Sequence, residues 1–311
     1  MDKQVCVIVP VKRAGREFTN HIRSLLELDH HSYEIIIVDD GLEEIPEALK
    51  QAKDRLLVLK SQSKGPSYAR NLAAKSTQAQ YLAFTDSDCI VAVDWLKELL
   101  KGFEIFPEAA SCGGKQDIPA DATFFERKVY KLLKKAGIVA EYTQYTGSKI
   151  SKVNHNPSCN VMYKRSVFLE EGGFLEGLWP GEDVELDYRL KKKGNIIVCN
   201  PRAVVYHHRP KDLNSFLRMM YRYGDVQGVL ARRYGFFRKV QIVPLAALAV
   251  LTALLLGYKT DFLIIRTELY FFLLLLLLLI YFAFDLFVFF LALSAFIFWH
   301  CGFFKGIIKG R

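Results

Sequence analysis

The chain has 311 residues, of which 51% are hydrophobic, and a formal net charge of +9. This length supports one large core or two modest domains. The six cysteines include no C-x-x-C pair, which indicates neither a disulfide framework nor a zinc site. The positive charge does not indicate nucleic-acid binding, because no nucleic-acid module is visible and the basic stretch adjoins an apolar block.

The first half predicts alternating strands and helices. Strands are expected at 4–11, 33–41, 55–60 and 81–86, and helices at 17–28, 43–53 and 64–76. In the last of these helices, Gly65 and Pro66 mark the start. The alternation predicts a mostly parallel, doubly wound α/β sheet. Because a strand is expected to begin at Gln4, no signal peptide is expected before it.

The second half is less regular. A strand is expected at 109–115, a basic helix at 121–136, and two short strands around Asn200-Pro201 within 195–208. No repeat or low-complexity linker precedes residue 240. Residues 1–208 are therefore expected to form one domain.

The rest of the chain predicts a membrane anchor. Residues 209–240 are expected to form a basic amphipathic segment on the membrane surface, with a plain connecting helix as the alternative. The apolar block 241–304 is expected to contain two or three transmembrane helices, and the sequence leaves their number open. Asp285 is interpreted as a turn between two of them, with a buried functional acid as the alternative. The chain is predicted to be a multi-pass membrane protein whose first domain, residues 1–208, faces the cytoplasm.

Carboxylates follow two of the predicted strands. Asp39 and Asp40 close "YEIIIVDDG", and Asp86 and Asp88 close "YLAFTDSD". In doubly wound sheets, ligands bind at the carboxyl ends of the strands. Two carboxylates at i and i+2 can share one hard cation and leave positions for phosphate oxygens. Mg²⁺ or Mn²⁺ is the expected cofactor, and a solvated turn is the alternative.

An ordered set of motifs carries a family resemblance. The segments "IIIVDDG", "KGPSYARN", "FTDSD", "NPSCNVMYKRSVFLEEGGF", "PGEDVELDYRL" and "AVVYHH" occur in this order within residues 4–208. Together they resemble family 2 glycosyltransferases, whose nucleotide-binding domain has the glycosyltransferase-A (Rossmann-like) fold. The resemblance implies a metal-dependent, inverting hexosyltransferase that uses a UDP-, GDP- or dTDP-linked sugar.

The resemblance also implies roles at matching positions. Donor contacts would fall on Pro10, Val11, Asp39, Asp40, Gly65, Arg70, Asn71, Asp86 and Asn160. Asp88 and Asp86 would bind the metal with a late histidine, His207 being slightly favoured over His208. Glu182 and Asp183 match the pair that holds the acceptor and supplies the catalytic base. Trp179 is a candidate for stacking on a sugar, with core packing as the alternative.

Physical chemistry agrees with these roles. A cation held by Asp88 would stabilise the charge that builds on the leaving diphosphate. Asp183 begins a predicted helix, whose N-terminal N–H groups favour its ionised form, so that it can accept the proton of an attacking hydroxyl. The chain departs from the family at Leu42 in "DDGL", at "PVKRAG" after the first strand and at Leu175. These departures affect the recognition of the donor base more than the reaction.

The resulting hypothesis is a membrane-anchored inverting glycosyltransferase with a lipid-linked or cell-envelope glycan acceptor and membrane lipids as partners. A polyprenyl-phosphate sugar synthase, a nucleotidyltransferase and an inactive nucleotide-binding scaffold are its rivals. A synthase would need Asp183 less, because a lipid phosphate needs no strong base. A nucleotidyltransferase would not need "GED", and a scaffold would have lost an essential acid.

Overall fold

The computed structural model describes residues 3–43, 47, 50, 56–135, 149–257 and 285–310. Its centre is a nine-stranded sheet in the order β3-β2-β1-β4-β8-β6-β9-β5, with β7 paired to β9. The first half of the sheet is parallel and contains β1 (Val5–Val11), β2 (Tyr33–Asp39), β3 (Leu57–Lys60) and β4 (Tyr81–Phe84). The predicted α/β class is confirmed, and the expected helix at 43–53 lies largely outside the described residues.

The other half of the sheet is mixed. Its strands are β5 (Cys89–Val91), β6 (Ala109–Asp117), β7 (Ser151–Lys152), β8 (Val161–Lys164) and β9 (Ile196–His207). Strand β8 runs antiparallel to both β4 and β6, whereas β6 and β9 are parallel.

The prediction of two short strands around Asn200 is wrong, because one strand, β9, passes through this region. Its register with β6 shifts between Gly114↔Asn200 and Lys115↔Val204, so the residues after Asn200 form a bulge. Proline lacks an N–H for a sheet ladder, and a bulge accommodates Pro201 without ending the strand.

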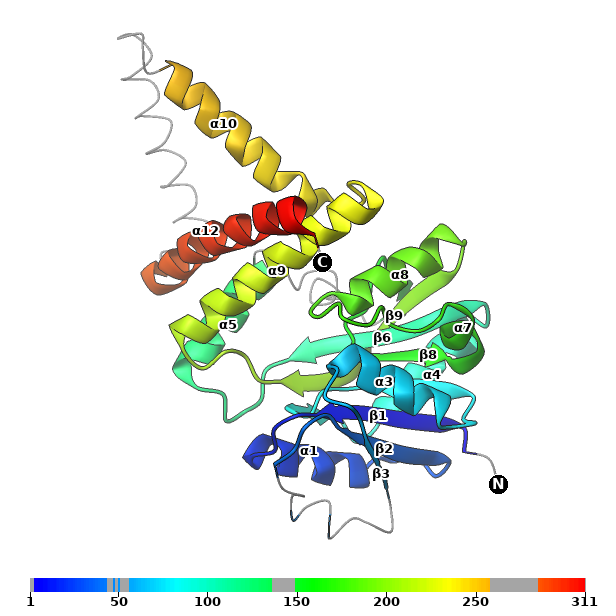
Figure 1. Ribbon diagram of the computed structural model, residues 1–311. Coiled ribbons are helices and arrows are strands. Elements are labelled where there is room, and N and C mark those ends of the chain that lie inside the picture. The colour runs from blue at the N-terminus through cyan, green and yellow to red at the C-terminus, as the bar shows by residue number, and fades with distance from the viewer. Residues whose placement is uncertain are drawn as a thin grey trace. The chain divides into compact units, whose positions relative to one another are not determined.

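Helices cover both faces of the sheet (Figure 1). On one face lie α1 (Arg16–Leu26) and α4 (Trp95–Ile105), and on the other α3 (Pro66–Lys75), α7 (Arg165–Glu170) and α8 (Glu182–Lys192). Alternate residues of β1 point to opposite faces, so that Val7 packs with one helical layer and Ile8 with the other. Because both faces are buried, β1 and residues 35–38 of β2 are apolar throughout.

By internal contacts, the chain divides into two compact units. The first contains residues 1–122 and 136–209, and the second residues 123–135 and 210–311. The second unit therefore includes α5 (Phe124–Lys135), which the sequence had grouped with the catalytic domain. Its other helices are α9 (Leu213–Tyr234), η1 (Lys239–Gln241), α10 (Val243–Gly257) and α12 (Leu286–Lys309).

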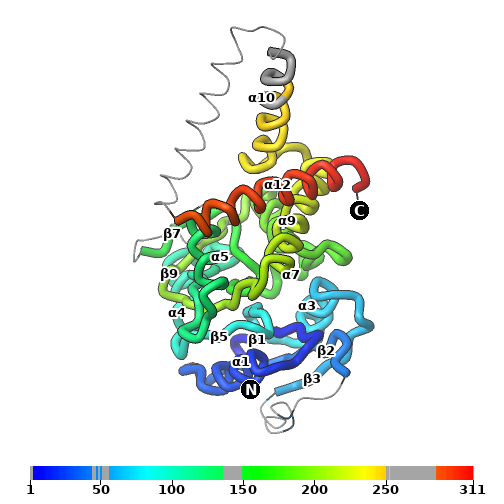
Figure 2. The backbone as a smooth tube through the Cα atoms, turned by 90° about the vertical axis from the view of Figure 1, so that its left-hand side faces the viewer, coloured from blue at the N-terminus to red at the C-terminus, as the bar shows by residue number. Residues whose placement is uncertain are grey.

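Within the second unit, α9 and α12 pack along each other through glycines (Figure 2). A Cβ atom on Gly224 would lie 1.8 Å from the carbonyl oxygen of Trp299, and one on Gly302 would lie 2.0 Å from that of Tyr221. Gly228 and Gly306 make the same kind of approach, so each helix carries a G-x-x-x-G pair. Small residues at this spacing let two backbones approach closely.

One described helix, α12, is long and apolar enough to cross a membrane, and α10 is shorter. Asp285 accepts from the N–H of Val288 and so caps the start of α12. Its carboxylate also lies 2.7 Å from Lys128 and from Lys131 on α5. A helix therefore begins directly after Asp285, and the predicted turn between two spans stays a prediction. Residues 258–284, which include part of the predicted spans, lie outside the described residues.

Candidate active site

The acidic residues of the sequence motifs gather at the carboxyl edge of the parallel strands. Asp39 ends β2, and Asp86 follows β4. The loop before α3 reaches the same edge, where Gly65 adopts a φ of +94° with no heavy atom within 4 Å of the position of a Cβ. A left-handed residue beside open space requires glycine and lets a ligand approach the backbone.

Local hydrogen bonds hold the first acidic pair. Asp39 Oδ1 accepts from the N–H of Gly41 at 3.0 Å and of Leu42 at 2.7 Å. Asp40 is buried and accepts from the hydroxyl of Ser61. Both carboxylates therefore shape the loop after β2, and their predicted contact with base and ribose stays a prediction.

The end of β1 is also fixed. Val11 is 1% exposed, so its side chain belongs to the core, and its carbonyl accepts from the N–H of Asp40 at 2.8 Å. Pro10 is partly exposed beside it. Of the two residues predicted to border the base, Pro10 alone offers side-chain surface at this edge.

Arg70 joins two acidic motifs that are far apart in the sequence. Its guanidinium donates to Asp86 Oδ1 at 2.6 Å and to Glu182 Oε1 at 2.7 Å. The Arg70 and Glu182 side chains are each 2% exposed, whereas that of Asp86 is 30% exposed. The planar fork of arginine suits such a bridge, since it fixes both carboxylates in orientation. The site thus places "DSD" next to "GED".

Glu182 and Asp183 differ sharply in environment. Burial, followed by the charge of Asp183, raises the pKa of Glu182 to about 7 despite the opposing charge of Arg70. The Asp183 side chain is 15% exposed, and its two oxygens accept from the N–H groups of Ser158 at 2.9 Å and Val184 at 2.8 Å. These bonds fix the orientation of the carboxylate. Asp183 is therefore the more accessible carboxylate and Glu182 the more enclosed one.

A buried network lies behind Asp183. His155 Nε2 is 4.0 Å from Asp183 Oδ1, and His155 Nδ1 is 2.8 Å from Asp187 Oδ2. Asp187 also accepts from the Tyr163 hydroxyl at 3.0 Å and from the N–H of Asn156 at 2.8 Å. The network fixes the ring of His155 with one nitrogen directed towards Asp183.

The second acidic pair converges with one of the two late histidines. Ligand atoms of Asp86, Asp88 and His207 all lie within 4.8 Å of one another. His207 Nε2 is 3.4 Å from Asp88 Oδ1. Burial opposes the charge of each group, but their attraction prevails, so the pKa of Asp88 falls and that of His207 rises. A positive charge is thus stabilised where these ligands meet.

Two carboxylates and one imidazole fit a divalent cation such as Mn²⁺ or Mg²⁺, with coordination positions left for phosphate oxygens.

His207 and His208 differ in position. His208 Nε2 lies 3.8 Å from Asp121 Oδ1 instead of facing Asp86 and Asp88. His207, which the sequence slightly favoured, is the histidine at the acidic pair.

Two predicted donor-binding residues serve as braces. Asn160 is fully buried, accepts from the Trp95 indole at 2.8 Å, and donates to the carbonyls of Lys115 and Ala203 at 2.9 and 3.0 Å. Asn71 pairs with both the N–H and the carbonyl of Phe174. Their amides hold the β9 bulge and the turn after α7, and their predicted contacts with the donor stay predictions. Trp179 is 47% exposed, which argues against core packing.

Sequence reasoning missed three residues of the site. Cys159 lies inside the motif that begins at Asn156, Cys89 directly follows "FTDSD", and His155 directly precedes Asn156. Motif adjacency was the available signal, but only folding brings the thiols of Cys89 and Cys159 next to His207.

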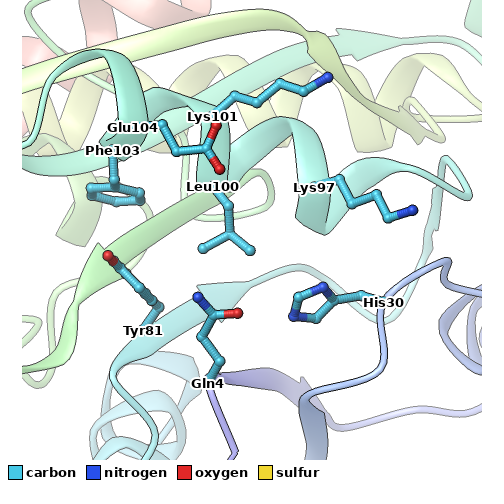
Figure 3. A pocket seen from close by; sticks show the side chains of 8 residues that line it. All are labelled: Gln4, His30, Tyr81, Lys97, Leu100, Lys101, Phe103 and Glu104. Carbon is cyan, nitrogen blue, oxygen red and sulfur yellow. The ribbon is translucent and has the colours of Figure 1, made fainter.

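A cavity of about 430 Å³ lies elsewhere on the first unit (Figure 3). Gln4 and Tyr81 mark the amino ends of β1 and β4, and residues of α4, including Leu100 and Lys101, line the other side. This is the edge of the sheet opposite to Asp39 and Asp86. Its position argues against a nucleotide site, because ligands of such sheets bind at the carboxyl ends.

The fold is of the glycosyltransferase-A type. The model of glycosyl transferase family 2 matches residues 6–171, more than half of the chain. The chain belongs to this family, as the motifs indicated.

Two curated relatives illustrate the similarity, one matched over part of its length and one over nearly all of it. The pre-mycofactocin glycosyltransferase of Mycobacterium tuberculosis is 26% identical over 246 residues, which are 75% of this chain and 48% of that protein. The chain thus spans about half the length of this relative. The dolichyl N-acetyl-alpha-D-glucosaminyl phosphate 3-beta-D-2,3-diacetamido-2,3-dideoxy-beta-D-glucuronosyltransferase of Methanococcus voltae is 23% identical over 328 aligned positions, covering 99% of this chain and 98% of that protein.

A solved structure shares the fold over the whole length. The mannosyltransferase PcManGT from Pyrobaculum calidifontis, in complex with GDP-Man and Mn²⁺, superposes with a TM-score of 0.70 at 17% identity. The match covers 100% of this chain and 89% of that chain. At this identity the likeness establishes the fold.

Proposed function

We propose that this glycosyltransferase is an inverting, membrane-anchored enzyme that moves a sugar from a nucleotide-sugar donor to a lipid-linked acceptor sugar. The observation that carries the proposal is the bridge from Asp86 through Arg70 to Glu182. It ties a centre suited to a metal-bound diphosphate to a centre suited to an acceptor hydroxyl. A transfer enzyme needs both groups held in register.

The donor side rests on the convergence of Asp86, Asp88 and His207. These residues would hold a divalent cation, which would neutralise charge on the diphosphate of the donor. The PcManGT complex with GDP-Man and Mn²⁺ has the same fold, which supports this assignment. The buried guanidinium of Arg70 donates to Asp86 at 2.6 Å and so orients this carboxylate.

The acceptor side rests on Asp183. Its carboxylate is oriented by two backbone N–H groups and remains partly exposed, so it can take the proton of an acceptor hydroxyl. Glu182 is enclosed, and its Oε1 accepts from the Arg70 guanidinium and the Ser158 hydroxyl. Direct attack by the deprotonated hydroxyl on the donor sugar inverts the anomeric centre.

The proposed acceptor follows from the Methanococcus voltae relative, whose name describes transfer to a sugar on dolichyl phosphate. The apolar helix α12 is long enough to anchor the chain in a membrane, where a lipid-linked acceptor resides. We further propose that the catalytic unit faces the cytoplasm, since basic residues are concentrated between Arg209 and Lys239.

A transfer assay with purified full-length protein in detergent tests the proposal. A panel of UDP-, GDP- and dTDP-linked sugars is offered with three acceptors: a polyprenyl-phosphate-linked sugar, polyprenyl phosphate alone, and no lipid. The expected product is a lipid-linked oligosaccharide of inverted anomeric configuration, formed only with the lipid-linked sugar.

Two outcomes contradict this function. Transfer to polyprenyl phosphate alone would identify a polyprenyl-phosphate sugar synthase. Nucleotide binding without transfer to any lipid or glycan acceptor in a membrane extract would favour the scaffold.

A further inference from the structure

Two thiols lie directly behind the proposed cation site. Ligand atoms of Cys89, Cys159 and His207 all lie within 4.8 Å of one another. Cys89 is fully buried and Cys159 is 4% exposed, whereas the His207 side chain is 20% exposed. Neighbouring elements fix their positions, because Cys89 on β5 pairs in register with His207 on β9.

Cys89, Cys159 and His207 form a softer ligand set than Asp86, Asp88 and His207. Thiolates select Zn²⁺ and other thiophilic ions, whereas Mg²⁺ and Mn²⁺ prefer oxygen ligands. A fourth ligand is close, since Asp88 Oδ1 lies 3.9 Å from Cys89 Sγ and 3.4 Å from His207 Nε2. Two sulfurs, one nitrogen and one oxygen can complete the tetrahedral shell that Zn²⁺ favours.

We propose that Cys89, Cys159 and His207, with Asp88, form a zinc site that excludes the catalytic cation. Binding is a ligand exchange without redox change, in which each thiol loses its proton to solvent and its sulfur coordinates the ion. Because one imidazole nitrogen of His207 cannot coordinate two ions, Zn²⁺ removes this ligand from the proposed Mn²⁺ or Mg²⁺ site and competes with that site for Asp88. Zn²⁺ therefore inhibits the enzyme, and this consequence rests on the proposed function.

Other cysteines show that burial alone does not create this arrangement. Cys199 is also fully buried, but it lies in the apolar layer that packs α3 and α8. Among the described residues, Cys89 and Cys159 are the cysteines that join a cluster with metal-ligand geometry. Cys199→Ser is therefore a matched control for a buried thiol, and Cys301→Ala removes the exposed thiol from the test background.

Cobalt reports thiolate ligands without any enzymatic assay. Metal-free full-length Cys301→Ala protein in detergent is titrated with Co²⁺, and Zn²⁺ is then added as competitor. The expected result is one Co²⁺ per chain with a thiolate-to-cobalt charge-transfer band that Zn²⁺ abolishes. Cys89→Ser and Cys159→Ser should each weaken binding at least ~100-fold, beyond the ~10–100-fold cost of losing an outer-shell partner. Cys199→Ser should retain the band, and equal binding in Cys159→Ser would overturn the proposal.

A measurement on the unmodified chain covers the case in which a serine variant does not fold. X-ray absorption of the protein with one equivalent of Zn²⁺ should show two sulfur neighbours at about 2.3 Å. A shell of nitrogen and oxygen alone would refute the site.

Inhibition of sugar transfer by Zn²⁺ is tested separately from metal binding. Mn²⁺ should relieve Zn²⁺ inhibition competitively, and failure of transfer with every donor would refute the proposed function while leaving the spectroscopic result to decide the zinc site.

Discussion

The guanidinium of Arg70 donates to Glu182 over 2.7 Å, and both side chains are 2% exposed. The other terminal nitrogen of the same guanidinium reaches Asp86 at 2.6 Å. The charge of Arg70 therefore compensates a buried carboxylate and orients a carboxylate at the proposed cation site. An isolated buried charge is costly, so both functions depend on one side chain.

Arg70→Lys should impair the enzyme although it preserves the charge. A lysine ammonium is a single point and cannot reproduce the two-armed bridge to Asp86 and Glu182. Arg70→Met removes the charge and should lower the free energy of unfolding by about 3–5 kcal/mol, because it leaves the buried carboxylate of Glu182 without its ion-pair partner. Thermal unfolding in detergent and single-turnover transfer would measure the two effects.

A second arginine provides the control for Arg70. Arg189 makes a forked contact with Glu185 on α8, and its side chain is 23% exposed. Arg189→Lys should change transfer far less than Arg70→Lys. Equal loss of activity in the two variants would show that the bridge has no particular role in catalysis.

The two adjacent histidines give a matched pair for the cation site. His207 faces Asp88, whereas His208 faces Asp121. His207→Gln should weaken Mn²⁺ binding at least ~10-fold, since it removes a proposed ligand. His208→Gln should bind Mn²⁺ like the unmodified protein, and excess chelator should abolish transfer in both. Calorimetric titration with Mn²⁺ checks this, and similar affinities in the two variants would place the cation elsewhere.

Much of the fold was readable from the sequence, because continuously apolar strands and amphipathic helices have distinct periods. The strand-end position of Asp39, Asp40, Asp86 and Asp88 followed from the same pattern. The motifs also identified Arg70 and Glu182 as site residues, but they did not indicate that the two side chains contact each other. Their direct bridge depends on how α3 and α8 pack against the sheet, which no local pattern encodes.

Other features could not be predicted because they depend on tertiary partners. Asn160 was assigned to the donor sugar, but in the fold its amide braces Trp95 and the β9 bulge. One continuous strand β9 could not be predicted, since Asn200-Pro201, where the bulge begins, has the sequence of a turn. The glycines of α9 and α12 allow close backbone contact, and this role is evident only when the two helices are packed against each other.

Acid should destabilise the protein through His21. Its Nδ1 lies 2.7 Å from the carbonyl of Cys89, and burial lowers the pKa of His21 to about 4 from 6.5. Between these values the unfolded chain binds a proton that the native chain does not, so the free energy of unfolding falls as the pH falls. The full effect is up to ~3 kcal/mol.

His21→Asn tests this assignment, because asparagine can donate to the same carbonyl but does not titrate. Denaturant unfolding in detergent across this pH range should show a shallower pH dependence than in the unmodified chain. His31→Asn changes an exposed histidine and is the control. An unchanged slope in His21→Asn would assign the acid sensitivity to other groups.

The interlocked glycines of the second unit should be intolerant of even one methyl group. A Cβ on Gly302 would lie 2.0 Å from the Tyr221 carbonyl oxygen, so Gly302→Ala must push α9 and α12 apart. The expected loss is at least ~1–3 kcal/mol, the usual cost of overpacking. Thermal unfolding measures it, with Cys301→Ala on the exposed side of α12 as the control. Equal melting of both variants would contradict the close packing.

The last prediction separates the two acidic centres, using Asp183→Asn and Asp88→Ala. Asparagine keeps the shape of Asp183 and can still accept from the N–H of Ser158, but it cannot accept the proton of an acceptor hydroxyl. Asp183→Asn should bind donor almost normally and transfer sugar at least ~100-fold more slowly, the lower scale for losing a general base. Asp88→Ala should instead weaken metal-dependent donor binding, because it removes a proposed cation ligand next to the diphosphate.

Calorimetric donor titration and single-turnover transfer on both variants distinguish these effects. Asp94→Asn changes an exposed acid at the start of α4 and should match the unmodified protein in both assays. Unchanged turnover in Asp183→Asn would place the base elsewhere or point to a phosphate acceptor, which needs no strong base. Unchanged donor affinity in Asp88→Ala would mean that the carboxylates after β4 form a solvated turn, because a cation ligand cannot be removed without loss of the binding that it supports.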